Sequence, residues 1–352
     1  MMISEAMENF SPDLTTFQLA SNCIPVRGAV RTLICDLQRQ IGRLIPSTFY
    51  DFIVSIDRRP LSILEHEHSS ADWAVLRKNM AGLISEGYAF WTPTSHVFVP
   101  MALDWESPAR VTNAIIDIAA TSTHDYKEIV GQLGQIGCLA IQFRSFTPLS
   151  LKNIHEICQA CNGSLLRHVD MILPFTIEFT ESALNEFCSQ NPLITRMTIY
   201  SSPYSKRMTI PLTPTFIDFE LGSFTTTSCG QVHEKLFSMN LHHVLESMSF
   251  NNCLNRKLSI DAQGEIRNCP STPEKYGDSK LVLLKDALKH HEFNKYDLIN
   301  KDHIEGCKDC EFRYVCTDCR AFVKSNDGVS ANNRVTSKPS KCHYDPYTAR
   351  WN

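Results

Sequence analysis

The residues with the greatest potential for chemistry are seven cysteines in the C-terminal part of the chain. A C-x2-C-x5-C-x2-C motif begins at Cys307 and is followed by one further cysteine, while two more frame Gly264 upstream. The seven are Cys253, Cys269, Cys307, Cys310, Cys316, Cys319 and Cys342. Thiolates this close in sequence act together when a soft metal or an iron–sulfur cluster joins them. We interpret this region as a metal or cluster site.

Length and composition narrow the class of protein. The 352 residues are enough for two or three domains, and a formal net charge of −4 gives no reason to expect nucleic acid as a partner. No apolar run approaches the roughly 20 residues that span a bilayer, and the N-terminus lacks the pattern of a signal peptide. We therefore expect a cytoplasmic protein with no membrane partner. In that reducing compartment, fourteen cysteines favour ligation or burial over disulfides.

The seven cysteines can be assembled into two ligand sets. Four of them, Cys307, Cys310, Cys316 and Cys342, could close a cage around a [4Fe–4S] cluster. The other three, Cys253, Cys269 and Cys319, would lack one protein ligand unless Cys229 joins them. The spacing also fits structural zinc, because C-x2-C pairs are common zinc knuckles. On spacing alone, both metals remain open.

The first 100 residues predict a small mixed module. The expected strands are residues 17–23, 31–37, 88–91 and 96–99. Pro25 and Gly28 would supply the turn between the first two strands, and Ile45 and Pro46 would open a helix. Ser69 is expected to cap a second helix with a continuous apolar face. We interpret residues 1–100 as a winged-helix-like module.

From about residue 111 the pattern alternates between strand and helix. Strands are expected at 114–119, 138–143, 169–173 and 197–200, with helices at 125–136, 149–161 and 181–188 between them. Such repetition favours a parallel sheet with right-handed crossovers, so residues 101–247 are interpreted as half of a (β/α) barrel. A hairpin over 257–268 and a short helix over 281–290 are expected in residues 248–352. The overall fold class is therefore α/β, or α+β for the whole chain.

The cysteine pattern resembles that of the SPASM domain. Cys253, Gly264 and Cys269 match its C-x10-G-x4-C element, and the C-x2-C-x5-C run with a late cysteine completes the pattern. The resemblance implies two [4Fe–4S] clusters, the first held by Cys253, Cys269 and Cys319. The second would be held by Cys307, Cys310, Cys316 and Cys342. Two residues separate Cys316 from Cys319 where the family has three.

The strand–helix region resembles a radical S-adenosylmethionine domain that has lost its working residues. That family carries C-x3-C-x2-C in the loop after its first strand, and residues 119–125 here contain no cysteine. Its Gly-Gly-Glu motif after the second strand is replaced by Ser145, Phe146 and Thr147. We therefore expect no S-adenosylmethionine binding and assign no catalytic residue.

The N-terminal sequence from Cys23 to Pro46 resembles the SPASM-domain peptide maturases of grasp-with-spasm systems. The resemblance covers nearly the whole chain and implies a precursor peptide and an ATP-grasp ligase as partners. It also implies that the N-terminal module is a leader-recognition element, which binds a peptide as an added strand. Two alternatives remain: a redox enzyme that uses an open iron of the first cluster, and a zinc-stabilised scaffold without chemistry. The remaining C-x2-C pair, Cys158 and Cys161, is interpreted as core because it shares an apolar helix face.

Overall fold

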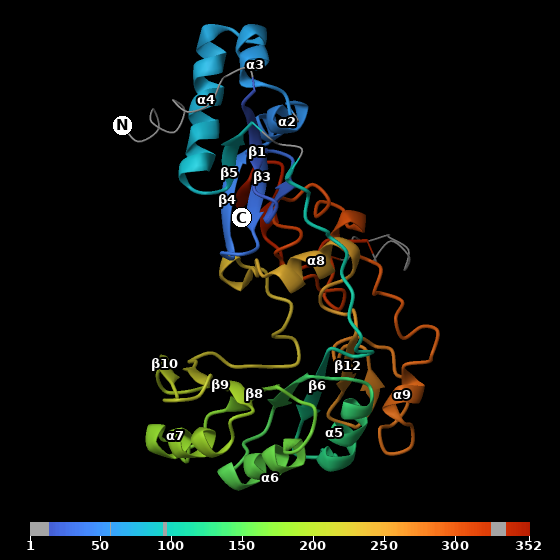
Figure 1. The fold of residues 1–352 in the computed structure, drawn as a ribbon. Helices are drawn as coiled ribbons and strands as arrows, with labels where there is room; N and C mark the ends of the chain where they lie inside the picture. Colours follow the sequence, from blue (N-terminus) through green and yellow to red (C-terminus); the bar gives the residue numbers. More distant parts are fainter. Residues whose placement is uncertain (1–13, 57, 94–96, 325–335) are drawn as a thin grey trace.

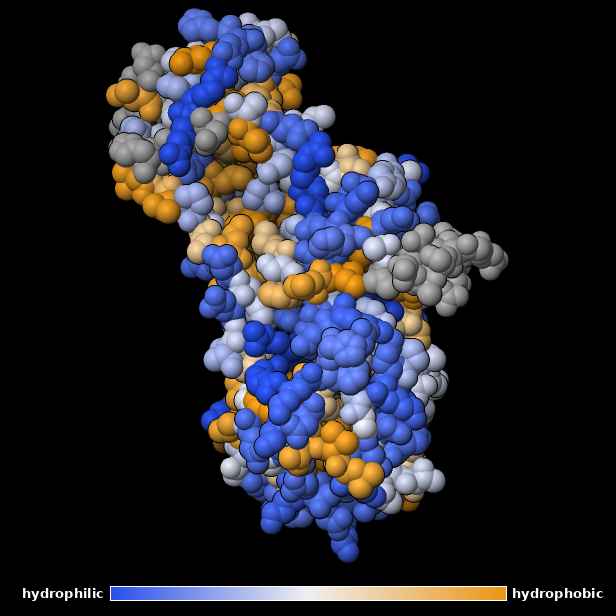
Figure 2. Space-filling model, turned by 90° about the vertical axis from the view of Figure 1, so that its right-hand side faces the viewer, coloured by the Kyte–Doolittle hydropathy of each residue, from blue (hydrophilic) through white to orange (hydrophobic). Residues whose placement is uncertain are grey.

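The computed structural model describes residues 14–56, 58–93, 97–324 and 336–352. It places an N-terminal module at one end, a strand–helix unit at the other, and the C-terminal segments between them (Figure 1). On the face shown in Figure 2, apolar side chains gather on the N-terminal module, while the strand–helix unit is mostly hydrophilic. None of the helices in the described ranges is both long and apolar enough to cross a membrane.

The N-terminal module contains a three-stranded antiparallel sheet in the order β2-β3-β4 and a separate pair, β1 with β5. Its elements are β1 (Thr16–Leu19), β2 (Cys23–Arg27), β3 (Arg31–Asp36), β4 (Ile41–Pro46), α2 (Ser47–Ser55), α3 (Leu61–Glu67), α4 (Ser70–Ser85) and β5 (Ala89–Thr92). Helix α4 begins as expected, because the Ser69 side chain accepts a hydrogen bond from the backbone N–H of Asp72. The three-stranded sheet and the helices that follow it make up most of the module.

Several details of this module correct the sequence-based expectation. Residues 17–23 do not form one strand, because β1 pairs with β5 while β2 starts the three-stranded sheet. Pro25 lies within β2, and the turn comes at Gly28. Ile45 and Pro46 end strand β4, and helix α2 starts only after them. Residues 97–99 form no strand, and the remainder of the expected 96–99 strand lies outside the described residues.

The strand–helix unit is built on an eight-stranded sheet in the order β10-β11-β9-β8-β7-β6-β12-β13. Its elements are β6 (Asn113–Ile118), α5 (Tyr126–Gln135), β7 (Ala140–Ser145), α6 (Leu151–Cys161), β8 (His168–Pro174), α7 (Glu181–Gln190), β9 (Ile194–Tyr200), β10 (Lys206–Thr209) and β11 (Phe216–Phe219). Strands β6 to β9 and β11 run parallel, so the expected alternation is confirmed. Helices α5, α6 and α7 lie together on one side of the sheet (Figure 1).

One strand of this sheet comes from the C-terminal segment. Strand β12 (Lys257–Ile260) pairs parallel with β6, and β13 (Ile266–Arg267) completes the expected hairpin. The hairpin therefore extends the strand–helix unit instead of standing apart from it. The remaining elements are η2 (Glu234–Leu236), α8 (Leu241–Ser249), α9 (Leu284–Ala287), η3 (Lys301–His303), β14 (Tyr344–Asp345) and β15 (Arg350–Trp351). Helix α9 is shorter than the expected 281–290 helix.

Strands β2 and β3 of the three-stranded sheet carry buried side chains on both faces. On one face Ile34 and Ile45 pack with the helices of the module. On the other face Val26, Leu33 and Cys35 join a core with the C-terminal segment. The C-terminal partners in that core are Phe312, Val315, Cys342 and Tyr344. Because successive side chains of a strand point to opposite faces, the same strands pack against the module's helices on one face and against the cysteine-rich segment on the other.

Candidate cluster sites

The structure gathers Cys307, Cys310, Cys316 and Cys342 around one pocket, which we name the 307 site. Tight turns bring three of them together: the backbone N–H of Cys310 donates to the carbonyl of Cys307, and that of Cys316 donates to the carbonyl of Phe312. Gly306 precedes them with φ +73°, a conformation that favours glycine. The cavity between them is small, about 20 Å³. These are the four cysteines of the second predicted set.

The wall of the 307 site is aromatic and reaches the N-terminal sheet. Phe312 packs against Phe237 and Tyr344, with ring centroids 5.0 and 5.1 Å apart. Between these rings and the sheet lies the carboxylate of Glu311, which is fully buried. Arg31 Nε donates to Glu311 Oε1 at 2.9 Å, and the Tyr344 hydroxyl donates to the same oxygen at 2.6 Å. The cysteine loop is therefore tied to strand β3 by an ion pair in which Glu311 is buried and Arg31 is partly exposed.

The backbone confirms how close this contact is. The N–H of Ala29 donates to the carbonyl of Asp309 at 2.8 Å. A Cβ added at Gly28 would lie 2.7 Å from the backbone nitrogen of Glu311, so only glycine fits this turn. The β2–β3 turn and the cysteine loop thus form one packed unit.

A lysine side chain is buried at the 307 site. Lys301 is 4% exposed, and its Nζ donates to Cys316 Sγ at 2.8 Å and to the carbonyl of Thr317 at 3.2 Å. Burial alone would lower the pKa of Lys301, but the negative charges of Cys316 and Cys307 in their thiolate forms raise it above its usual value. Lysine is almost never fully buried without an anionic partner. The ammonium therefore marks the 307 site as a place suited to negative charge.

Burial raises the pKa of three thiols at the 307 site, whereas it lowers that of a lysine. It raises the pKa of Cys307 to about 12, and it also raises the pKa of Cys310 and Cys316. At neutral pH these cysteines are protonated unless a cation takes the place of the proton. Metal binding at the site must therefore release protons.

The other predicted set forms a second group, which we name the 253 site: Cys253, Cys269 and Cys319. Cys253 and Cys269 flank the β12–β13 hairpin, and Lys257, the first residue of β12, directs Nζ toward Cys253 Sγ at 3.6 Å. Burial alone would lower the pKa of Lys257, but the sulfurs of Cys253 and Cys269 raise it. Burial, and then the nearby Cys253, raises the pKa of Cys319 to about 11. The three predicted cysteines therefore lie together, again beside a lysine.

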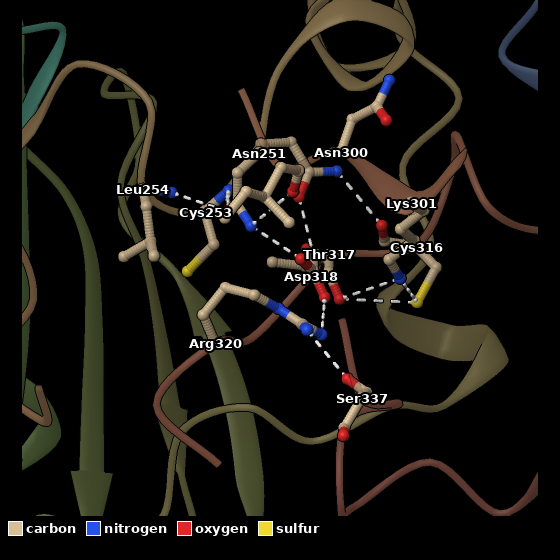
Figure 3. A network of polar contacts seen from close by, with 12 residues as sticks. Asn251, Cys253, Leu254, Asn300, Lys301, Cys316, Thr317, Asp318, Arg320 and Ser337 are labelled. Atoms are coloured by element: carbon tan, nitrogen blue, oxygen red, sulfur yellow. Dashed lines mark hydrogen bonds and ion pairs between the residues drawn. The ribbon is translucent and has the colours of Figure 1, made fainter. Parts of the chain in front are cut away.

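A buried polar network separates the two sites. Asp318, between Cys316 and Cys319 in sequence, accepts hydrogen bonds from Asn251 at 2.6 Å and from Arg320 at 2.7 Å. Asn251 in turn accepts from the backbone N–H of Cys253. Figure 3 shows the side chains of Cys253 and Cys316 on opposite sides of this network. The network fixes the two sites relative to each other.

The donor chemistry fits a cluster. In the parts of the chain that the structure describes, no three His, Cys, Asp or Glu side chains lie close enough to hold a single metal ion. A tetrahedral zinc ion with Zn–S bonds of about 2.3 Å would draw its sulfurs to within about 4 Å of one another. An iron–sulfur cluster puts its own iron and sulfide atoms between the cysteines and needs a wider cage. Cysteines around a pocket, with an ammonium beside them, suit such an anionic group.

A buried ion pair lies at the ends of β6 and β7, the edge of the sheet where radical S-adenosylmethionine enzymes bind their cofactor. Arg144, at the end of β7, donates to Asp117 at 2.6 and 2.7 Å, and both side chains are almost fully buried. The Tyr200 hydroxyl donates to the carbonyl of Ser145, one of the residues that replace Gly-Gly-Glu. In the 119–125 loop, Ser122 donates to the carbonyl of Ala262. These contacts use side chains and backbone groups at this edge for packing within the protein.

Four cysteines outside the two sites are core residues. Cys158 and Cys161 are buried in the main core of the strand–helix unit, with Cys138 and Cys188. Lys301, Lys257 and Glu311 could not be recognised from the sequence, because isolated charged residues carry no motif. The nearest signal in the sequence is their position beside the cysteines.

Comparisons with known proteins give no close relative. No protein-family model and no curated protein matches the chain. Among solved structures, it is similar to Streptococcus suis SuiB bound to S-adenosylmethionine, with 9% identity and a TM-score of 0.33. That match covers 87% of this chain and 96% of the other. It is also similar to SuiB bound to precursor peptide SuiA, with 10% identity, the same coverage and a TM-score of 0.30. Likeness at this level does not establish a shared fold.

Proposed function

We propose that this chain is an iron–sulfur protein of peptide maturation in the cytoplasm. It would hold a [4Fe–4S] cluster at the 307 site and a second at the 253 site, and act with an ATP-grasp ligase on a precursor peptide. The observation that carries the proposal is the pairing of each cysteine group with a lysine, the buried Lys301 or the partly buried Lys257. The clusters would supply folding stability and electron-transfer capacity.

The precursor peptide would bind to the N-terminal module by adding a strand to β4. Among the described residues no strand pairs with the outer edge of β4. Its Ile41 and Leu44 side chains are 44% and 37% exposed, as expected for a strand that offers both backbone groups and apolar contacts. The opposite edge strand, β2, is a poorer template because Pro25 has no N–H.

The chain would bind and present the peptide, and the ATP-grasp partner would form the new ester or amide bond. The ion pair between Asp117 and Arg144, at the edge of the parallel sheet, supports this division. We accordingly expect no 5′-deoxyadenosine when the reduced protein is mixed with S-adenosylmethionine. Sustained release of that product would assign the chain to the enzymes that cleave this cofactor.

Metal analysis tests the cluster part of the proposal. Full-length protein purified without oxygen should be brown and contain up to about eight irons and eight sulfides, the capacity of two four-iron clusters. Stoichiometric zinc without sulfide would instead support the zinc-stabilised scaffold.

Peptide titration tests the recognition part, using the full-length chain and the precursor peptide that the proposal predicts as its partner. Replacing Ile41 and Leu44 together by Asp should weaken binding at least tenfold, about 1.4 kcal/mol. Val54→Asp is the matched control, because Val54 is 55% exposed on α2 of the same module. Deleting residues 1–100 is a poor test, since it would uncover the apolar wall of the 307 site. Equal affinities for all three proteins would exclude the β4 edge.

A further inference from the structure

A fourth cysteine lies beside the 253 site. Cys229 belongs to an irregular segment between β11 and η2, far from the other cysteines in sequence. Its Sγ is 3.6 Å from the hydroxyl of Ser271, whose backbone N–H donates to the sulfur of Cys269. Cys229 and Cys269 therefore flank the same residue.

The next residue brings this segment against a third cysteine. Gly230 has φ +79°, and a Cβ built on it would lie only 2.9 Å from Cys319 Sγ. Any larger residue would be strained by the backbone conformation and would collide with that sulfur. The chain at Cys229 and Gly230 is thus packed directly on the 253 site.

Two further contacts hold the segment in place. Lys341 Nζ donates to the carbonyl of Cys229 at 2.6 Å and also to the carbonyl of Thr227. The hydroxyl of Ser271 donates to the carbonyl of Thr226 at 3.3 Å. The segment that carries Cys229 is therefore anchored on both sides of the site.

We propose that Cys229 is the fourth ligand of the 253 site, where it completes a cage of four thiolates with Cys253, Cys269 and Cys319. This inference rests on the proposed iron–sulfur function. On binding, the thiol of Cys229 would lose its proton to solvent and form an Fe–S bond. The resulting cluster would have no open iron, so it could transfer electrons but could not bind a substrate directly.

The test compares the wild-type chain with Cys229→Ala and with Cys188→Ala, a buried core cysteine in the strand–helix unit. The proteins are reconstituted without oxygen and analysed for iron and by electron paramagnetic resonance, with and without cyanide as a small iron ligand. The wild type and Cys188→Ala should hold about eight irons, with spectra that cyanide does not change. Cys229→Ala should either lose about half the iron or gain a cyanide-sensitive signal.

Alkylation with iodoacetamide, followed by peptide mass spectrometry, tests the wild-type chain without any substitution. Because Cys229 is only partly buried, it should react quickly in chelator-stripped protein and be protected at least tenfold in loaded protein. Equal reaction rates in loaded and stripped protein would overturn the assignment. So would a Cys229→Ala protein that keeps all its iron and the wild-type response to cyanide. Wild-type protein without iron would instead refute the proposed function itself.

Discussion

The two cysteine sites are built in different ways. The four cysteines of the 307 site come from one short loop and the chain that follows it, and the site packs against the N-terminal sheet. The 253 site is assembled from the ends of a hairpin, a residue beyond the cysteine loop and the neighbourhood of Cys229. The hairpin also belongs to the large parallel sheet. One site is therefore coupled to the candidate peptide-binding module, and the other to the strand–helix unit.

This difference suggests separate roles for the two sites. A cluster at the 307 site would stabilise the sheet whose edge strand is β4, because Glu311 and Arg31 join the two. A cluster at the 253 site would stabilise the junction between β12 and β6 instead. The Asp318 network is the direct link between them. Three sets of substitutions can test the comparison.

The largest expected effects come from removing one ligand at each site. Cys316→Ala and Cys319→Ala should each lose about half of the roughly eight irons. Cys316→Ala should also speed hydrogen exchange in β2 and β3, because its site packs against that sheet, whereas Cys319→Ala should speed exchange in β12. The measurements are iron analysis and hydrogen exchange with mass spectrometry.

Cys158→Ala is the control for both variants, since Cys158 is buried in the main core but lies in neither site. It should keep all the iron and lose only the packing of one side chain. If both ligand variants loosened the same strands, the sites would not be coupled to different parts of the fold.

A smaller effect is expected from breaking the ion pair between the 307 site and β3. Among the described residues, Arg31→Met would leave the buried Glu311 carboxylate with the Tyr344 hydroxyl as its one side-chain hydrogen-bond partner. Removing one partner of a fully buried pair costs about 3–5 kcal/mol, and because Arg31 is partly exposed we expect about 2–3 kcal/mol in urea unfolding.

Arg27→Met provides the matched control for this pair. The side chains of Arg27 and its partner Asp51 are both half exposed, and such surface pairs contribute less than about 1 kcal/mol. Equal losses of stability in the two variants would mean that Glu311 does not bind the cysteine loop to the sheet.

Local signals in the sequence predicted much of this architecture. Helix α4, for example, starts at its expected Ser69 cap, and helix α6 lies within the expected 149–161 range. The close spacing from Cys307 to Cys316 likewise indicated the 307 site, because neighbouring residues in a tight loop must lie together.

Long-range pairing accounts for what the sequence did not predict. Strand β1 pairs with β5, which follows the three helices of the module in the sequence. Nothing local in residues 16–19 indicates that partner. The 257–268 hairpin was expected, but its parallel pairing of Lys257 with Asn113 was not. Lys301 was missed for a similar reason, because burial of an ammonium depends on which sulfur the fold places beside it. Such features arise from tertiary packing rather than from local pattern.

The smallest and most specific effect should come from the lysines beside the two sites. Lys301→Met removes a positive charge 2.8 Å from Cys316 Sγ while keeping most of the length of the side chain. In loaded protein, loss of this charge should lower the reduction potential of the cluster at the 307 site, because the reduced cluster carries more negative charge. Stripped protein should become as stable or more stable, because a buried ammonium near neutral thiols costs desolvation energy that methionine avoids.

Lys257→Met should lower the potential of the cluster at the 253 site by less, since its ammonium is 3.6 Å from the nearest sulfur. Lys338→Met is the control, because Lys338 lines the same pocket but donates to the carbonyl of Tyr344. Potentiometric titration followed by electron paramagnetic resonance resolves the two clusters. Unchanged potentials in Lys301→Met would mean that its ammonium has only a packing role.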